Sequence, residues 1–157
     1  MNLKLENKVI NIDADLRSLI KSQVEGDVYF DEITREIYST DASIYRIVPL
    51  CVAVPKTVND IKALVQISNE YGIPILPRGG GSSLSGQTVN RAIVIDFTKH
   101  INKVIDVNKE SMTAIAQPGI TIDNLNSILK KQSLLFTPDP STTNRATVGG
   151  VIGNNSC

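Results

Sequence analysis

A glycine- and serine-rich stretch between two apolar runs constrains the fold of this chain more than any other segment. It covers residues 77–87 and begins Pro-Arg-Gly-Gly-Gly-Ser-Ser. Glycine has no Cβ, so three in succession allow several backbone amides to converge on one point. Such a concave row of amides suits a phosphate or pyrophosphate. Arg78 adds a positive charge at the entrance, and Ser82, Ser83 and Ser85 add hydroxyl donors.

The residues around this stretch distinguish between types of phosphate loop. A P-loop requires Lys-Ser/Thr where the chain has Gln87 and Thr88. A dinucleotide-binding fingerprint requires a third glycine where Leu84 stands. Both also require a helix directly after the loop, whereas the apolar run at 92–97 predicts a strand. The pattern therefore predicts a phosphate loop between two strands, with a flexible surface loop as the alternative.

Composition limits the class of protein. The chain has 157 residues, 41% of them hydrophobic, which suits one domain or a large piece of one. Its 16 basic and 16 acidic residues balance, so there is no electrostatic argument for nucleic acid as a partner. One histidine and two cysteines offer neither a metal site nor a disulfide framework, and Cys51 is expected to be a packed thiol. Without a bilayer-spanning run or a signal-peptide core, we expect a cytoplasmic protein, or one peripheral at the inner membrane when full length.

Hydrophobic periodicity predicts an α+β fold with mixed and parallel pairing and flanking helices. A sheet is expected from strands over 51–54, 73–76, 92–97 and 112–117, with further strands at 103–107 and 134–136. Helices are expected over 13–26, 31–38, 58–71 and 121–132. Thr57 and Thr121 are the expected N-caps of the last two helices. Residues 1–12 are expected to be a mobile lead-in.

Three segments together resemble one family, the flavin-binding half of FAD-linked oxidases and dehydrogenases of the vanillyl-alcohol oxidase fold, also called PCMH-type. The segments are residues 55–63, residues 77–87, and residues 138–156 with their Pro-Asp-Pro-Ser and late Gly-Gly and Asn-Asn pairs. The sequence is most similar to the bacterial D-lactate, glycolate and D-2-hydroxyglutarate dehydrogenase branch. The resemblance implies a helical lead-in over 1–46 and a PCMH-type FAD-binding domain over 47–157, truncated at its C-terminal end.

The resemblance also implies which residues bind FAD, with the amides of residues 79–83 on the pyrophosphate. The implied FAD-binding residues are Arg78, Gly79, Gly80, Gly81, Ser82, Ser83, Leu84, Gly86, Gln87, Pro138, Asp139, Thr142, Ala146, Thr147, Gly149, Gly150, Asn154 and Asn155. Relatives that attach flavin covalently at this loop carry histidine where Ser82 stands, so FAD is expected to be non-covalent. Two alternatives stay open, Arg78 as a surface ion-pair residue and the Asn-Asn pair as a helix or turn cap.

The activity implied by the resemblance is oxidation of a small 2-hydroxy acid such as D-lactate, glycolate or D-2-hydroxyglutarate. Hydride would pass to FAD, and electrons would leave to a quinone, a cytochrome or an electron-transfer flavoprotein. The family's catalytic residues would lie beyond Cys157, so the isolated chain is expected to be inactive and no catalytic residue is assigned. Two alternatives remain, an enzyme like UDP-N-acetylenolpyruvoylglucosamine reductase and a phosphate-ligand binding module without catalysis.

Overall fold

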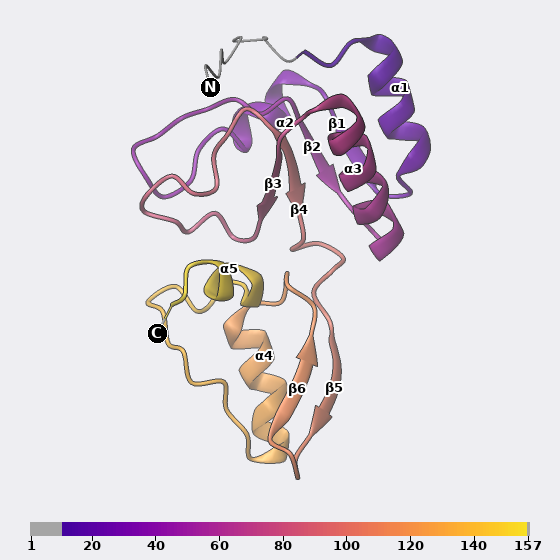
Figure 1. Ribbon diagram of the computed structural model, residues 1–157. Helices are drawn as coiled ribbons and strands as arrows, with labels where there is room; N and C mark the ends of the chain where they lie inside the picture. The colour runs from indigo at the N-terminus through magenta and orange to yellow at the C-terminus, as the bar shows by residue number, and fades with distance from the viewer. Residues whose placement is uncertain (1–10, 157) are drawn as a thin grey trace, which may run out of the picture.

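The computed structural model describes residues 11–156, which form two parts stacked one above the other (Figure 1). The first part contains α1 (Ala14–Gln23), β1 (Asp27–Tyr29), α2 (Glu32–Ile37), β2 (Cys51–Val54), α3 (Val58–Tyr71), β3 (Ile75–Arg78) and β4 (Ile93–Asp96). The second contains β5 (Val104–Asn108), β6 (Thr113–Ala116), α4 (Ile122–Leu129), a 3-10 turn (Lys130–Gln132) and α5 (Val148–Gly153). The α+β class expected from the sequence is confirmed.

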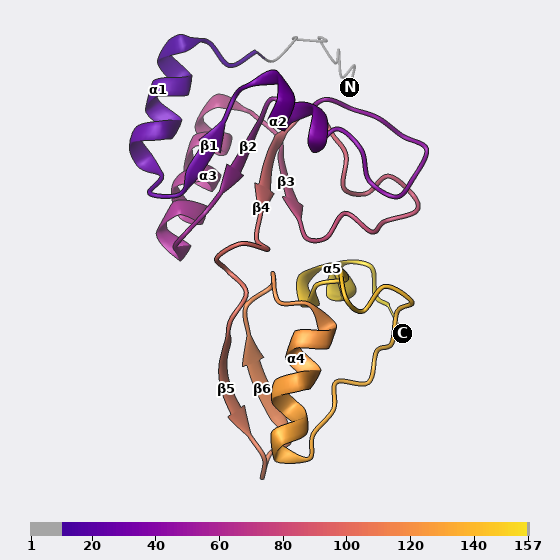
Figure 2. The ribbon, with the colours of Figure 1, turned by 180° about the vertical axis from the view of Figure 1, so that it is seen from behind.

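The first part is built on a four-stranded sheet in the order β1-β2-β4-β3. The strands β2, β4 and β3 run parallel, and β1 is antiparallel to β2. Alternate residues face opposite sides: Cys51 and Ile93 join the core formed with α1 and α3, whereas Val52 and Val94 pack with Tyr38 on the other side. Helices α1 and α3 therefore cover one face, as the view from behind shows (Figure 2).

The core of this part includes Ile12, a residue of the expected mobile lead-in. Residues 1–10 lie outside the described residues, but Ile12 is buried with Leu16 and Ile20 against the sheet. Cys51 is buried in the same core, as expected, and burial raises the pKa of its thiol to about 12. At neutral pH this thiol stays protonated and is no nucleophile.

A buried carboxylate fixes the start of α3. Thr57 and Asp60 form the expected capping box, and Asp60 is only 2% exposed. Its two oxygens also accept the backbone N–H groups of Glu25, Gly26 and Lys56, at 3.1, 3.2 and 2.8 Å. Burial alone would raise the pKa of Asp60, but these hydrogen bonds lower it. One side chain therefore joins the turn after α1 to the first turn of α3.

The second part is a β5–β6 hairpin against which α4 packs. Its core contains Leu125 and Leu129 of α4 together with Val104, Val107 and Ala116 of the hairpin. The expectation that 112–117 belongs to the main sheet is wrong, because β6 pairs only with β5. The expected hairpin between these two strands is confirmed. None of the helices formed by residues 11–156 has the length and apolarity needed to cross a membrane.

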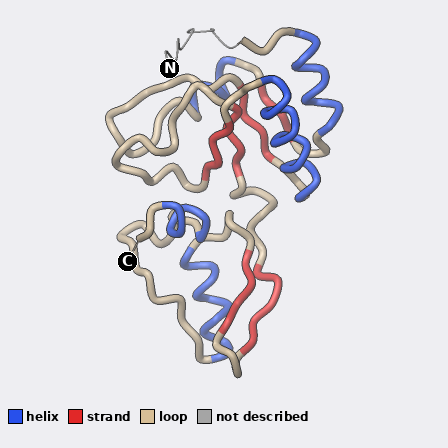
Figure 3. Tube along the Cα trace, viewed as in Figure 1, coloured by secondary structure: helices blue, strands red, loops and turns tan. Residues whose placement is uncertain are grey.

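Two further expectations about secondary structure differ from the structure. The three-residue strand β1 was not predicted, and the strand expected at 134–136 is loop (Figure 3). At Phe136 the side-chain amide of Asn126 replaces a neighbouring strand: Oδ1 accepts the Phe136 N–H at 2.8 Å, and Nδ2 donates to its carbonyl at 3.2 Å. The backbone at Phe136 is therefore satisfied without a sheet.

Candidate functional site

The candidate site begins at the glycine loop, residues 79–88, which leaves the end of β3. In the part of the chain that the structure describes, the backbone N–H groups of residues 79–83 donate to no carbonyl and no side chain. Gly81 has a φ of +64°, a conformation that side chains other than glycine rarely adopt. Five free amides in succession around such a residue are what an anion-binding nest requires.

The glycine loop lies against the chain just before α5. A Cβ added to Gly79 would overlap with Oγ1 of Thr147, and one added to Gly80 would overlap with the carbonyl oxygen of Arg145. Further along, Nε2 of Gln87 donates to Oδ1 of Asn154 at 3.4 Å. The structure thus brings together two segments that are far apart in the sequence, with α5 next to the end of β3 (Figure 1).

The residues at the start of α5 use most of their polar groups inside the protein. Thr147 is 2% exposed and caps α5, its Oγ1 accepting the N–H of Gly150 at 3.3 Å. The amides of Ala146 and Gly149 donate to the carbonyls of Thr142 and Pro118, at 2.7 and 2.9 Å. These residues therefore provide a close backbone surface rather than free donors.

Arg78 holds the two ends of the glycine loop. Its Nη1 donates to the carbonyls of Tyr38 and Thr88, at 3.2 and 3.1 Å, and its Nη2 donates to that of Thr40 at 2.8 Å. The guanidinium also lies 5.1 Å from the centre of the Tyr38 ring, and burial lowers its pKa. Arg78 forms no ion pair with any described residue, so the surface ion-pair alternative is wrong.

The serines and Leu84 of the loop have different environments. Ser83 is buried, and its hydroxyl donates to the side-chain oxygen of Gln87 and accepts the N–H groups of Ser85 and Gln87. This hydroxyl shapes the loop and is not a free donor. Ser82 is half-buried, while Leu84 is 80% exposed at the tip.

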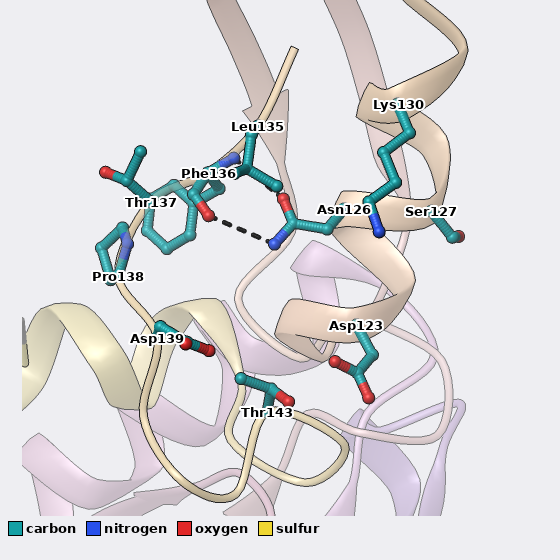
Figure 4. A pocket seen from close by; sticks show the side chains of 10 residues that line it. All are labelled: Asp123, Asn126, Ser127, Lys130, Leu135, Phe136, Thr137, Pro138, Asp139 and Thr143. Carbon is teal, nitrogen blue, oxygen red and sulfur yellow. Dashed lines mark hydrogen bonds between the residues drawn. The ribbon is translucent and has the colours of Figure 1, made fainter. Parts of the chain in front are cut away.

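Pro138 and Asp139 line a separate open pocket of about 670 Å³ beside α4 (Figure 4). Its other lining residues are Asp123, Asn126, Ser127, Lys130, Leu135, Phe136, Thr137 and Thr143. The residues of the glycine loop do not line it. Asn155, at the end of α5, is exposed with a φ of +49°, and Asn154 is the C-cap of that helix. Asn154 thus ends α5 as a cap residue, and whether the Asn-Asn pair also contacts FAD remains a prediction.

The sequence did not identify Asn126 and Asp41 as residues of the site. Asn126 holds the segment that carries Pro138 and Asp139, through its two bonds to Phe136. Asp41 binds the far end of the glycine loop through Thr88. Only the local bond of Asp41 to the N–H of Ser43, two residues on, has a sequence signal, because Asp commonly accepts such a bond; the bonds to Phe136 and Thr88 span 10 and 47 residues and have none. Residues 11–156 contain no group of three His, Cys, Asp or Glu side chains able to hold a metal ion.

The sequence matches the family described as "FAD binding domain" over residues 49–157. Among curated proteins, it is 37% identical over 135 residues to D-2-hydroxyglutarate dehydrogenase from Haemophilus influenzae, covering 84% of this chain and 13% of that protein. It is also 37% identical over 140 residues to glycolate oxidase subunit GlcD from Bacillus subtilis, covering 85% and 29%. The mitochondrial D-lactate dehydrogenase [cytochrome] of Kluyveromyces lactis is 35% identical over 113 residues, covering 69% and 19%. The chain thus spans less than a third of the length of these relatives.

Solved structures support the same assignment. An alkyldihydroxyacetonephosphate synthase superposes with a TM-score of 0.71 at 28% identity, covering 79% of this chain and 26% of that one. p-Cresol methylhydroxylase, the PCMH of the fold's name, shares the fold alone at 20% identity, with a TM-score of 0.70 over 88% of this chain and 28% of that one. The family match covers residues 49–157, and the fold and the five free amides of the glycine loop agree with it. The chain therefore belongs to the family of PCMH-type FAD-binding domains.

Proposed function

We propose that this chain forms the FAD-binding part of a flavin-dependent dehydrogenase of a small 2-hydroxy acid. The observation that carries the proposal is the row of five free amides at residues 79–83, held close to the backbone of Arg145 and the side chain of Thr147. The names of the three curated relatives, which are dehydrogenases or an oxidase of D-2-hydroxyglutarate, glycolate and D-lactate, support the substrate class.

In this proposal the glycine loop binds the pyrophosphate of FAD. Amides that converge on two negatively charged phosphates form short, charge-assisted hydrogen bonds, and in this proposal the hydroxyl of Ser82 adds one more. Because Gly79 and Gly80 carry no side chains, the loop can lie directly against the Thr147 side chain and the Arg145 carbonyl before α5. Pro138 and Asp139 would line the flavin. The bound flavin supplies the hydride acceptor for oxidation of the alcohol carbon.

The electron acceptor is a quinone, a cytochrome or an electron-transfer flavoprotein in this proposal. The Kluyveromyces relative is named with a cytochrome, which supports a one-electron acceptor of that class. The test is a comparison of D-2-hydroxyglutarate, D-lactate and glycolate as substrates of the complete natural protein, followed by dye reduction. Reduction with one of the three supports the substrate class, and a protein that binds FAD but reduces dye with none of them would contradict it.

FAD should be bound without a covalent bond. The glycine loop contains no histidine, cysteine or tyrosine, and a serine hydroxyl such as that of Ser82 is a weak nucleophile unless a base activates it. The thiol of Cys51 is buried in the sheet and protonated. Acid precipitation of the holoprotein should therefore release all of its flavin into the supernatant, measured by absorbance. Yellow colour that stays in the washed pellet would show a covalent link and contradict the assignment.

A further inference from the structure

We propose that the segment of residues 38–46, which lies before the matched FAD-binding domain, is a working part of the FAD site and that its Asp41 is a positioning residue. The segment holds the glycine loop in the shape that presents its amides. The inference rests on the proposed function, in which FAD binds at that loop. It follows from contacts at the start, the middle and the end of the loop.

The 38–46 segment is itself fixed to the sheet. The hydroxyl of Tyr38 donates to Oδ2 of Asp96 at 2.5 Å, and Asp96 is buried at the end of β4. Burial and this hydrogen bond raise the pKa of Tyr38, so the phenol stays a donor at neutral pH. The segment then folds back on itself, because Thr40 and Arg46 form an antiparallel bridge. Arg46 also pairs with Glu36 of α2. The segment can therefore act as a rigid support.

At the start of the loop, the segment supplies the carbonyl groups that bind Arg78. The Nη1 of Arg78 donates to Tyr38 and its Nη2 donates to Thr40. The guanidinium lies under Gly81, where an added Cβ would come within 2.6 Å of Nη2. Three carbonyls hold the Arg78 guanidinium, so the side chain keeps one rotamer and fills the space below the loop.

In the middle of the loop, the segment sets the direction of an amide. The N–H of Ala42 donates to the carbonyl of Gly81 at 3.1 Å. The peptide bond is planar and trans, so the N–H of Ser82 in the same peptide must point away from the segment. In the same way, the N–H of Phe97 binds the carbonyl of Arg78 at 3.2 Å, which turns the N–H of Gly79 away from β4. These amides are therefore aimed before any ligand arrives.

At the end of the loop, Asp41 joins the segment to Thr88. Its Oδ2 accepts the Thr88 N–H at 3.3 Å and the Thr88 hydroxyl at 2.9 Å, while Oδ1 accepts the N–H of Ser43 at 2.9 Å. Burial opposes ionisation of Asp41, but these hydrogen bonds prevail and lower its pKa. Beside it, Gly86 has a φ of +76° and lies against the Tyr45 ring, which is 2.6 Å from the position of an added Cβ.

The segment contacts the loop through Arg78, the carbonyl of Gly81 and Thr88. None of these contacts uses the five amides of residues 79–83, which stay free. A loop that is already ordered loses less conformational freedom when it binds its ligand. Loss of the Asp41 contact should therefore lower affinity for FAD without altering any group that touches FAD.

The test compares Asp41→Ala with Asp31→Ala in the complete natural protein. Asp31 is the matched control, because its carboxylate also caps a local N–H, that of Thr34 at 2.8 Å, but has no bond to the loop. FAD titration followed by flavin fluorescence should show a dissociation constant about tenfold higher for Asp41→Ala, the size of one hydrogen bond to a charged group. Asp31→Ala should bind like wild type. Asp41→Asn keeps one acceptor oxygen, so its dissociation constant should lie between those of Asp41→Ala and Asp31→Ala.

Amide hydrogen exchange without FAD distinguishes a local effect on the loop from a general loss of stability. In Asp41→Ala the amides of residues 79–88 should exchange faster, while those of β2 and β4 keep their protection. If Asp41→Ala does not fold, Thr88→Val removes the hydroxyl partner of Asp41 and should give the same pattern with a smaller change. Unchanged exchange in the loop, or unchanged FAD affinity in Asp41→Ala, would overturn the inference. Complete wild-type protein that fails to bind FAD would instead contradict the proposed function, and the exchange result would still decide the role of the segment.

Discussion

Replacing Gly80 by alanine should weaken FAD binding by roughly 5- to 150-fold. The added Cβ would overlap with the carbonyl oxygen of Arg145, which is backbone and cannot rotate away. Moving the loop to relieve the overlap costs about 1–3 kcal/mol, the usual range for overpacking, and that free energy converts to the expected fold change. Titration with FAD, followed by quenching of flavin fluorescence, measures the effect.

The matched control for this change is Gly153→Ala. Gly153 lies in the last turn of α5, and an added Cβ there meets no atom within 4 Å. It should bind FAD like wild type. Equal affinity of the Gly80 and Gly153 variants would show that the loop does not bind its ligand in the position described, and the pyrophosphate assignment would then be wrong.

Replacing Asp60 by alanine should lower the free energy of unfolding by about 3–5 kcal/mol. The change leaves several backbone N–H groups at the start of α3 and at Glu25 and Gly26 without an acceptor, and each unsatisfied buried group costs about 1–3 kcal/mol. Urea unfolding measured by far-UV circular dichroism gives the difference. Glu70→Ala, in the exposed last turn of the same helix, is the control and should change stability by no more than about 0.5 kcal/mol.

The contribution of Asp60 should also depend on pH. Its pKa is lower in the folded chain than in the unfolded chain, so the stabilisation is complete above the unfolded pKa of about 3.9. It is lost as the pH falls through the folded pKa. The difference in stability between wild type and Asp60→Ala should therefore be constant near neutral pH and shrink below about pH 4. A difference that stays constant into acid would show that Asp60 is not bound as its ionised form.

Much of the fold could be predicted because single residues mark the element boundaries. Thr57 and Asp60 form the capping box, and Gly72 ends α3 with a φ of +64°, so this helix was predicted at its full length. The pairing of strands is different. The sequence of β6 is the same whether the strand joins the main sheet or only β5, because periodicity records which face is apolar but not which strand lies beside it. The three residues of β1 are too few to show any period.

The candidate site was predictable where its chemistry lies in the backbone. Glycines at 79, 80 and 81 indicated amides and close approach, and both are present in the structure. The role of Arg78 was not predictable, because a positive charge beside a glycine loop suits a phosphate equally well. Its partners are carbonyls of residues 38 and 40, which come close only when the chain folds. Whether the 18 expected residues contact FAD remains a prediction.

The strand order of the main sheet has a consequence for the order of events during synthesis. β2 and β3 are not neighbours, since each pairs with β4, which the ribosome makes last of the three. The backbone edges of β2 and β3 that pair with β4 therefore have no partner until residue 96 leaves the exit tunnel, a period in which the nascent chain is open to chaperones and to misfolding. Insertion of β4 then closes the sheet and anchors the second end of the glycine loop in a single step. The glycine loop thus takes shape late, together with the core and not before it.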